Sequence, residues 1–165
     1  MVGDVSDMYP EYSLGVRDMF DVNRNKIDEP LLGTNMSIRF KADCSTQIID
    51  GVDYQNQLAK GVISDIRNGI ILEPQGTLTN NGTKGNPCLV ADIWGDYREE
   101  LILRTEDSTA LRIYTSTEVS DRALFTLMED AMYRVGVAWQ NNCYNQPCYP
   151  SFYYGSDMDF RDIEI

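Results

Sequence analysis

The fold of this chain is decided by the stretch Glu100–Thr115, which reads ELILRTEDSTALRIYT. Two runs rich in Leu, Ile and Tyr flank the polar sequence Glu-Asp-Ser at 106–108, and these residue types favour a turn. Polar and apolar residues alternate in 111–115, as they do in a strand with one buried and one solvated face. The stretch therefore predicts two strands, Glu100–Thr105 and Ala110–Thr115, joined by a short turn.

Segments of the same character lie on both sides of this pair. Further strands are predicted at Gly15–Asp21, Ser37–Lys41, Cys88–Ile93, Tyr133–Trp139 and Ser151–Tyr154. Three or four short strands at roughly ten-residue spacing, followed by a longer excursion, are typical of a propeller blade. The predicted fold class is therefore all-β, with long loops.

Two segments are predicted to lie outside the strands. The apolar residues of Asp43–Ala59 have weak helical spacing, broken by Gly51, so we expect a loop or a short helix. Pro74–Asn86 is polar and glycine-rich, and we expect a long loop there. Long loops in compact domains often carry function.

The composition narrows the class of protein. Of the 165 residues, 42% are hydrophobic and 24% are charged, which is ordinary globular usage. No run approaches the ~18 apolar residues of a membrane span, and the N-terminal region has no signal-peptide pattern. The net charge of -12 argues against a nucleic-acid partner, because a phosphate backbone needs a basic surface.

The chain contains no histidine. It therefore lacks the usual proton shuttle near neutral pH and the commonest nitrogen ligand for zinc or copper. Any bound metal is expected to be hard and oxygen-bound, and calcium is the leading candidate.

Four cysteines stand at positions 44, 88, 143 and 148, at spacings poorly suited to an all-cysteine zinc site. Cys143 and Cys148 flank a short Tyr-Asn-Gln-Pro turn and could form a disulfide if their Cα atoms lie within ~7 Å. The alternative is four free thiols. An extracellular location would favour the disulfide.

Three acidic turns lie next to predicted strands. In each, oxygen-bearing residues recur within a few positions, so that side chains and carbonyl groups can converge on a cation with 6–8 oxygen ligands. Alternatively, the Asp and Asn side chains only cap backbone groups of solvated turns. The turn at Asp21–Ile27 is the weakest candidate, since Arg24 and Lys26 place positive charge there. The predicted calcium ligands are Asp4, Ser6, Asp7, Asp92, Trp94, Asp96 and Glu100.

An ordered series of motifs begins with NNGTK at 80–84 and ADIWGDYREE at 91–100. It continues through RTEDS at 104–108, LRIYT at 111–115, TLM at 126–128 and YRVGVAWQN at 133–141, and ends with YNQP at 144–147 and PSFYYG at 150–155. This series, over about half of the chain, resembles the C-terminal region of the rhamnogalacturonan lyases of polysaccharide lyase family 11. The segments GDV at 3–5 and FDVN at 20–23 fit more loosely.

The resemblance implies an eight-bladed, calcium-binding β-propeller that cleaves the rhamnogalacturonan I backbone of pectin by β-elimination. A complete catalytic propeller is several times longer than this chain. The chain is therefore expected to form the last two or three blades, with 1–75 and 76–165 as approximate blade groups.

The resemblance also indicates partners and a location. Isolated blades leave unpaired strand edges. The expected partners are therefore the remaining blades or a second copy of the chain, together with the pectic polysaccharide, and neither nucleic acid nor membrane is expected. A bacterial protein that is secreted or attached to the cell surface is implied.

The same resemblance places Asn81, Gly82, Thr83 and Lys84 in the substrate cleft. Gly82 would allow close approach of the backbone, and its neighbours offer hydrogen bonds to sugar hydroxyls. Lys84 is expected to bind the galacturonate carboxylate. A role as the base that removes the C5 proton is secondary, because it needs a lowered pKa. By its residues alone, this segment is better explained as an ordinary turn, and the resemblance reverses that preference.

Other residues suited to an acidic polysaccharide have structural alternatives. Arg98, Arg104 and Arg112 are expected to pair with nearby acidic residues. Aromatic side chains could stack on sugar rings, although burial between blades is the commoner role for such residues. These aromatic residues are Trp94, Trp139, Tyr144 and Tyr149.

The sequence thus predicts part of a calcium-dependent rhamnogalacturonan lyase. Because the chain would supply at most one wall of the active site, it is expected to be inactive alone. The alternatives are a non-catalytic, calcium-binding carbohydrate-binding module and a calcium-stabilised structural repeat.

Overall fold

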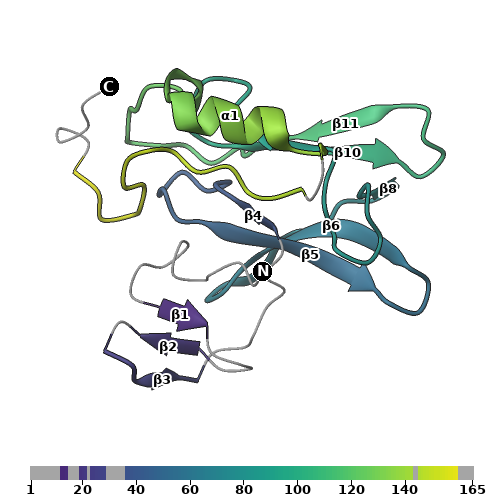
Figure 1. The fold of residues 1–165 in the computed structure, drawn as a ribbon, viewed down its shortest axis with the longest axis horizontal. Helices are drawn as coiled ribbons and strands as arrows, with labels where there is room; N and C mark the ends of the chain where they lie inside the picture. The colour runs from purple at the N-terminus through teal and green to yellow at the C-terminus, as the bar shows by residue number, and fades with distance from the viewer. Residues whose placement is uncertain (1–11, 15–18, 22, 29–35, 143–144, 160–165) are drawn as a thin grey trace.

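The computed structural model describes residues 12–14, 19–21, 23–28, 36–142 and 145–159. These residues form three antiparallel sheets and one α-helix (Figure 1). The first sheet has the order β1-β2-β3 and comprises β1 (Tyr12–Leu14), β2 (Met19–Asp21) and β3 (Lys26–Ile27). The strand expected at Gly15–Asp21 is therefore confirmed at its C-terminal end.

The second sheet is a four-stranded meander in chain order. It consists of β4 (Met36–Ile38), β5 (Gln47–Asp53), β6 (Leu58–Asp65) and β7 (Gly69–Leu72). β4 confirms the strand expected at Ser37–Lys41, although it is shorter and begins one residue earlier.

The expectation of a loop or short helix at Asp43–Ala59 was wrong, because β5 and the start of β6 occupy most of this segment. The first three residues of β5 are all buried, so the strand lacks the alternation by which half-buried strands are recognised. Gly51, which interrupts the helical spacing, lies at φ +91° where the register between β5 and β6 shifts. It is a β-bulge glycine, not a helix breaker.

The third sheet contains the segment that decides the fold. β10 (Glu100–Thr105) pairs with β11 (Leu111–Tyr114) and, on its other side, with both β8 (Thr77–Leu78) and β9 (Leu89–Ala91). The predicted strands at Cys88–Ile93, Glu100–Thr105 and Ala110–Thr115 are confirmed. The loop expected at Pro74–Asn86 contains the two-residue strand β8.

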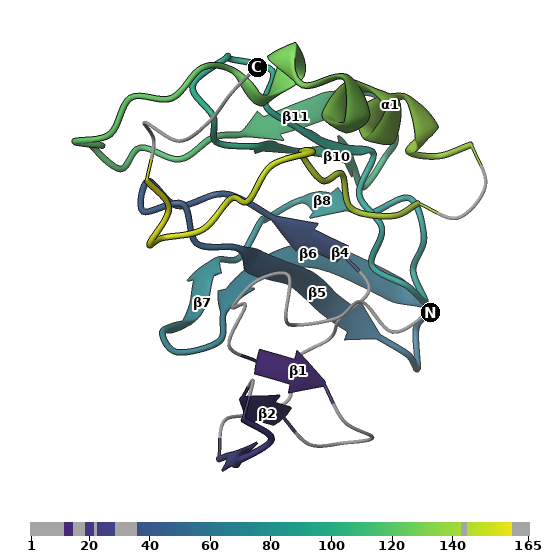
Figure 2. The ribbon, with the colours of Figure 1, turned by 60° about the vertical axis from the view of Figure 1, so that its left-hand side comes forward.

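The main hydrophobic core lies between the second and third sheets. Apolar side chains of β4, β5 and β6 pack there against those of β9 and β10. The buried members are Met36, Ile38, Ile49, Ile63, Val90, Leu101 and Leu103. Two views related by a 60° rotation show the two sheets stacked (Figures 1 and 2).

The strand predicted at Tyr133–Trp139 was wrong, since α1 (Ala131–Trp139) occupies this segment. Asp130 caps the helix by accepting a hydrogen bond from the Tyr133 amide at 2.7 Å. A short 3-10 helix, η2 (Leu127–Glu129), precedes it. Val135, Val137 and Trp139 alternate with other residues as in a strand, but the cap and the burial of Tyr133 favour the helix.

A second cluster packs α1 against the chain that follows it. Its members are Cys44, Tyr97, Leu127, Tyr133, Cys148, Tyr154 and Met158. The strand predicted at Ser151–Tyr154 was wrong, since this segment forms bends and joins no sheet. Its side chains Phe152 and Tyr154 pack against the second cluster. The described residues thus form a β-rich domain with few helices, in agreement with the coarse prediction. None of their helices is long and apolar enough to cross a membrane.

Candidate functional site

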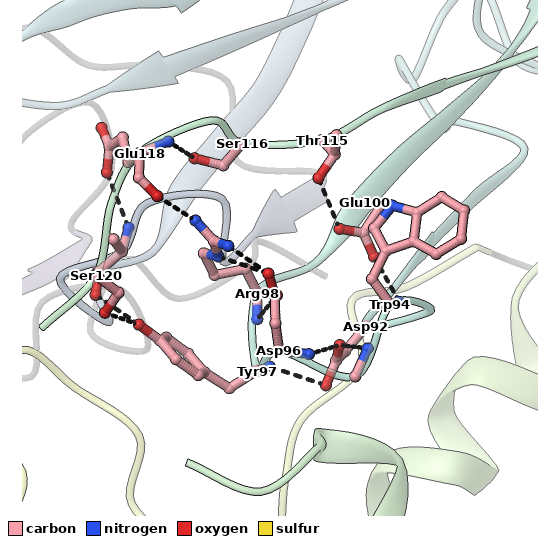
Figure 3. Close-up of polar contacts among 12 residues, drawn as sticks. Asp92, Trp94, Asp96, Tyr97, Arg98, Glu100, Thr115, Ser116, Glu118 and Ser120 are labelled. Carbon is pink, nitrogen blue, oxygen red and sulfur yellow. Dashed lines mark hydrogen bonds and ion pairs between the residues drawn. The ribbon is translucent and has the colours of Figure 1, made fainter. Parts of the chain in front are cut away.

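The Asp92–Glu100 loop connects β9 to β10 and is organised by buried carboxylates (Figure 3). Asp92, 1% exposed, accepts hydrogen bonds on Oδ1 from the amides of Gly95 and Asp96, at 2.8 and 3.0 Å. Its Oδ2 accepts from the amides of Tyr97 and Leu127, at 3.2 and 2.7 Å, and from the Thr126 hydroxyl at 2.9 Å. Five donors therefore surround one carboxylate.

Glu100 closes the other end of the loop. Its Oε2 accepts from the amides of Ile93 and Trp94, at 3.0 and 3.2 Å, and its Oε1 from the Thr115 hydroxyl at 3.2 Å. Burial raises the pKa of Glu100 to about 7, against the effect of these hydrogen bonds, which lower it. No lysine or arginine donates to this carboxylate among the bonds of the described residues.

Asp96, in the middle of this loop, is paired with an arginine of the same loop. Asp96 accepts from the backbone amide of Arg98 at 3.1 Å and forms an ion pair with its guanidinium. The same guanidinium donates to the Glu118 carbonyl at 2.7 Å. Trp94 lies on the outside of the loop with 59% of its surface exposed.

The side chains of this loop do not fit a calcium ion as arranged. The oxygens of Asp92, Asp96 and Glu100 already accept hydrogen bonds from backbone amides or an arginine, whereas a cation needs oxygens that face it. Among the residues that the structure describes, no group of three or more Cys, Asp or Glu side chains is arranged to hold a metal. The other predicted ligands, Asp4, Ser6 and Asp7, lie outside the described residues, and calcium binding remains a prediction.

The predicted substrate segment Asn81–Lys84 follows β8 and forms a tight exposed turn. The Asn81 side-chain oxygen accepts from the amides of Thr83 and Lys84, both at 3.0 Å, and from the Thr83 hydroxyl. The Asn81 carbonyl accepts from the Gly85 amide at 2.9 Å, and Asn81 forms a bridge with Asn86. One asparagine thus fixes the shape of the turn.

Gly82 is packed against the β5–β6 hairpin. A Cβ atom added there would lie 1.8 Å from the Gln57 carbonyl oxygen, closer than any side chain permits. The close backbone approach expected of this glycine is therefore toward the hairpin, and it anchors the turn. Lys84 is exposed, and its ammonium group makes no ion pair within the described parts of the chain.

Three asparagines that the sequence analysis missed brace this turn from the side of α1. The Asn80 amide donates to Asn141 Oδ1 at 3.2 Å, and the Asn141 amide in turn donates to the Cys88 carbonyl. The Asn145 amide donates to the Pro87 carbonyl at 3.0 Å. Asn141 has φ +64°, a conformation that asparagine tolerates better than most residues. All three asparagines stand in the motifs quoted above, but nothing in those motifs indicated that they lie against this turn.

A family model described as "Rhamnogalacturonan lyase family 11, C-terminal domain" matches residues 2–163. The chain belongs to this family. Its relatives include rhamnogalacturonan exolyase YesX of Bacillus subtilis strain 168, which is 46% identical over 136 residues covering 79% of this chain and 22% of YesX. Rhamnogalacturonan endolyase YesW of the same strain is 39% identical over 165 residues, covering 96% and 25%.

Solved structures of family 11 lyases share the fold. The crystal structure of YesW matches with a TM-score of 0.76 at 38% identity, covering 96% of this chain and 27% of YesW. The Bacillus licheniformis rhamnogalacturonan lyase matches with the same TM-score and identity. The chain thus spans about a quarter of the length of the curated relatives.

A buried ion pair forms the centre of this family 11 domain and was also missed. Arg39 donates to Glu99 through its backbone amide at 2.7 Å and through its guanidinium at 3.3 Å. The Tyr133 hydroxyl donates to Glu99 at 2.7 Å and accepts from the Asp92 amide at 2.9 Å. Arg39, Glu99 and Tyr133 are each at most 3% exposed. No local pattern could have indicated partners so far apart in the sequence.

The remaining arginines of the family 11 motifs also have structural partners, although not the acidic side chains expected. Arg104 donates to the Ser108 hydroxyl at 3.1 Å, and Arg112 donates to the Gln75 carbonyl at 2.7 Å. Cys44, Cys88 and Cys148 are free thiols, and Cys148 is buried next to Gln140. The free-thiol alternative therefore holds for these three, while Cys143 lies outside the described residues.

Proposed function

We propose that this domain is one wall of the substrate cleft of a calcium-dependent lyase that cleaves the rhamnogalacturonan I backbone of pectin by β-elimination. The observation that carries this proposal is the Asn81–Lys84 turn, which is anchored at Gly82 and presents an exposed ammonium group. Similarity to YesX, a rhamnogalacturonan exolyase, and to YesW, a rhamnogalacturonan endolyase, supports it.

The chemistry assigns a binding role to Lys84. Elimination requires that the galacturonate carboxylate be neutralised, that a base remove the C5 proton, and that the C4 oxygen depart. An exposed ammonium group pairs readily with a carboxylate, whereas proton removal by lysine requires burial or a nearby cation to lower its pKa. Lys84 therefore binds the carboxylate, and the base comes from another part of the enzyme.

The sheets support a propeller architecture. A four-stranded antiparallel meander in chain order, such as β4–β7, is the unit from which propeller blades are built. The proposed boundary near residue 75 falls between the end of β7 and the start of β8. We propose that the chain supplies the last two or three of eight blades and is completed by further blades or a second copy. A pectic substrate favours secretion or attachment to the cell surface.

Calcium is proposed as a stabilising ligand. When bound, it would neutralise carboxylates of the chain or of the substrate. Because the carboxylates of Asp92, Asp96 and Glu100 already have donors, the remaining predicted ligands are Asp4, Ser6 and Asp7, which lie outside the described residues. Addition of a chelator should lower the melting temperature and calcium should restore it, as binding to the folded state requires. An unchanged melting temperature would remove calcium from the proposal.

Lys84→Ala tests the substrate role. It should weaken the binding of rhamnogalacturonan oligosaccharides at least several-fold and leave the melting temperature unchanged, since Lys84 is exposed. Lys60→Ala is the matched control. Lys60, on β6, is also exposed, but its ammonium group already pairs with the carboxylate of Glu73 at 3.5 Å. Equal binding by both variants would contradict the proposal, and loss of stability in Lys84→Ala would indicate a structural turn.

The second candidate function is a carbohydrate-binding module without catalysis. It is favoured by the lack of histidine, the usual proton shuttle near neutral pH, in these 165 residues. The chain alone should release no unsaturated product from rhamnogalacturonan, as measured by ultraviolet absorbance. Release of such product would assign the complete active site to these residues.

A further inference from the structure

An open groove is lined by residues of α1 and by residues of the segment that follows residue 145. Figure 1 shows this segment running beneath α1. The volume of the groove is about 350 Å³, within the range of small-ligand pockets. Gly136 allows α1 to approach the segment after residue 145 closely, because a Cβ atom at this position would lie 3.2 Å from the Cα of Cys148. The other described residues that line the groove are Met132, Val135, Trp139, Gln146, Pro147 and Tyr149.

The chemistry of the groove differs from that of the whole chain. The chain has a net charge of -12, but none of the described residues that line the groove is charged. Trp139 is 70% exposed and Tyr149 is half-buried. The guanidinium of Arg39 lies 5.4 Å from the centre of the Tyr149 ring and holds it in place. Gln146 adds an amide that is able to bond a hydroxyl group.

The groove adjoins the proposed substrate turn. Trp139 ends α1, and two residues later Asn141 accepts the hydrogen bond from Asn80 at 3.2 Å. The end of α1 and the segment before Asn81 are therefore tied together. Figure 2 shows α1 ending on the same side of the molecule as the tip of the β5–β6 hairpin, on which Gly82 packs.

We propose that this groove binds a neutral sugar residue of the polysaccharide whose acidic sugar contacts Lys84. This inference rests on the proposed function and adds a second subsite to it. Aromatic rings pack against the C–H faces of a pyranose, and a deoxy sugar such as rhamnose adds a methyl group. A uronate would lose hydration here without a cation to replace it, so the uncharged lining selects the rhamnosyl residue.

The two tryptophans of the chain provide the measurement. Their indole N–H signals in a ¹H–¹⁵N NMR spectrum are assigned with Trp139→Phe, and Trp94, outside the groove, serves as the internal control. Methyl α-L-rhamnopyranoside should shift the Trp139 signal saturably and leave that of Trp94 in place. Methyl galacturonate at the same concentration should shift Trp139 far less. A flat rhamnoside titration would overturn the proposal.

Oligosaccharide binding separates this inference from the proposed function. Trp139→Ala should weaken binding about five- to tenfold, and Trp139→Phe should recover most of it. If Lys84→Ala weakens binding but Trp139→Ala does not, the groove is refuted and the substrate turn stands. The reverse result keeps the groove and refutes the turn. A Trp139 signal that shifts with protein concentration and not with sugar would assign the groove to a second copy and overturn the proposal.

Discussion

Asp92→Asn tests whether the Asp92 carboxylate organises its loop through hydrogen bonds. The substitution keeps the size of the side chain but replaces one acceptor oxygen with an NH2 group. If the remaining oxygen faces Tyr97 and Leu127, the amides of Gly95 and Asp96 lose their acceptor. If the side chain is turned the other way, the amides of Tyr97 and Leu127 lose theirs. In either case two amides lose their acceptor: those of Tyr97 and Leu127 are buried, whereas those of Gly95 and Asp96 lie nearer the surface.

An unpaired buried amide costs ~1–3 kcal/mol, and the substituted side chain is expected to free the Gly95 and Asp96 amides, which water can partly solvate. The free energy of unfolding should therefore fall by about 1–3 kcal/mol. Urea denaturation followed by circular dichroism measures this loss. Asp96→Asn is the matched control in the same loop, and it should cost less than ~1 kcal/mol because its ion pair with Arg98 is partly exposed.

The same measurement separates hydrogen bonding from calcium binding. If Asp92 acts by hydrogen bonding, its variant is destabilised equally with and without a chelator. If Asp92 is instead a cation ligand, the chelator should lower the stability of the parent chain to that of the variant. The difference in the free energy of unfolding between the two would then disappear. A loss below ~1 kcal/mol under both conditions would refute the role of the five donors.

Two further predictions concern the substrate turn and the helix cap. Gly82→Ala should displace the turn from Gln57, lower the free energy of unfolding by ~1–3 kcal/mol and weaken oligosaccharide binding. Gly69→Ala is the control and should leave binding intact, because its added Cβ atom meets nothing within 4 Å. Unchanged stability and binding in Gly82→Ala would contradict the packing. Asp130→Ala should cost ~1–2 kcal/mol at pH 7 by thermal unfolding. Burial works to raise the pKa of Asp130, but hydrogen bonds from Ser151 and the Tyr133 amide outweigh it and hold this pKa below its usual value. The stabilisation is therefore present above the unfolded pKa of ~4 and is lost as pH falls through the lower folded pKa. The Asp130→Ala variant should thus lose less stability in acid than the parent. Equal losses of stability in both proteins as the pH falls would contradict this role.

The strands of the third sheet could be predicted because their apolar residues recur in short runs between clear turns. α1 could not be recognised by periodicity, since Val135, Val137 and Trp139 alternate as in a strand. The readable signal was Asp130 at the N-cap. β5 was hidden because its first three residues are all buried and show no alternation, and because a bulge glycine resembles a helix breaker.

The candidate site shows a different limit. The sequence located the Asp92–Glu100 loop and the Asn81–Lys84 turn, but not what their side chains contact. A carboxylate that caps amides and one that binds a cation both occur as Asp in a turn, so residue type does not separate them. The contact between Gly82 and Gln57 joins two loops distant in the sequence, and no local pattern encodes it.

The buried pair of Arg39 and Glu99 has a consequence for how the domain opens. A nine-residue helix such as α1 does not persist alone in water, so its amides are protected only while it remains docked. Detaching α1 would remove the Tyr133 hydroxyl from Glu99 and admit water to an ion pair held by strand, loop and helix together. The amide protons of α1 should therefore exchange with solvent at the rate set by global unfolding, and the helix and the two stacked sheets should behave as a single cooperative unit.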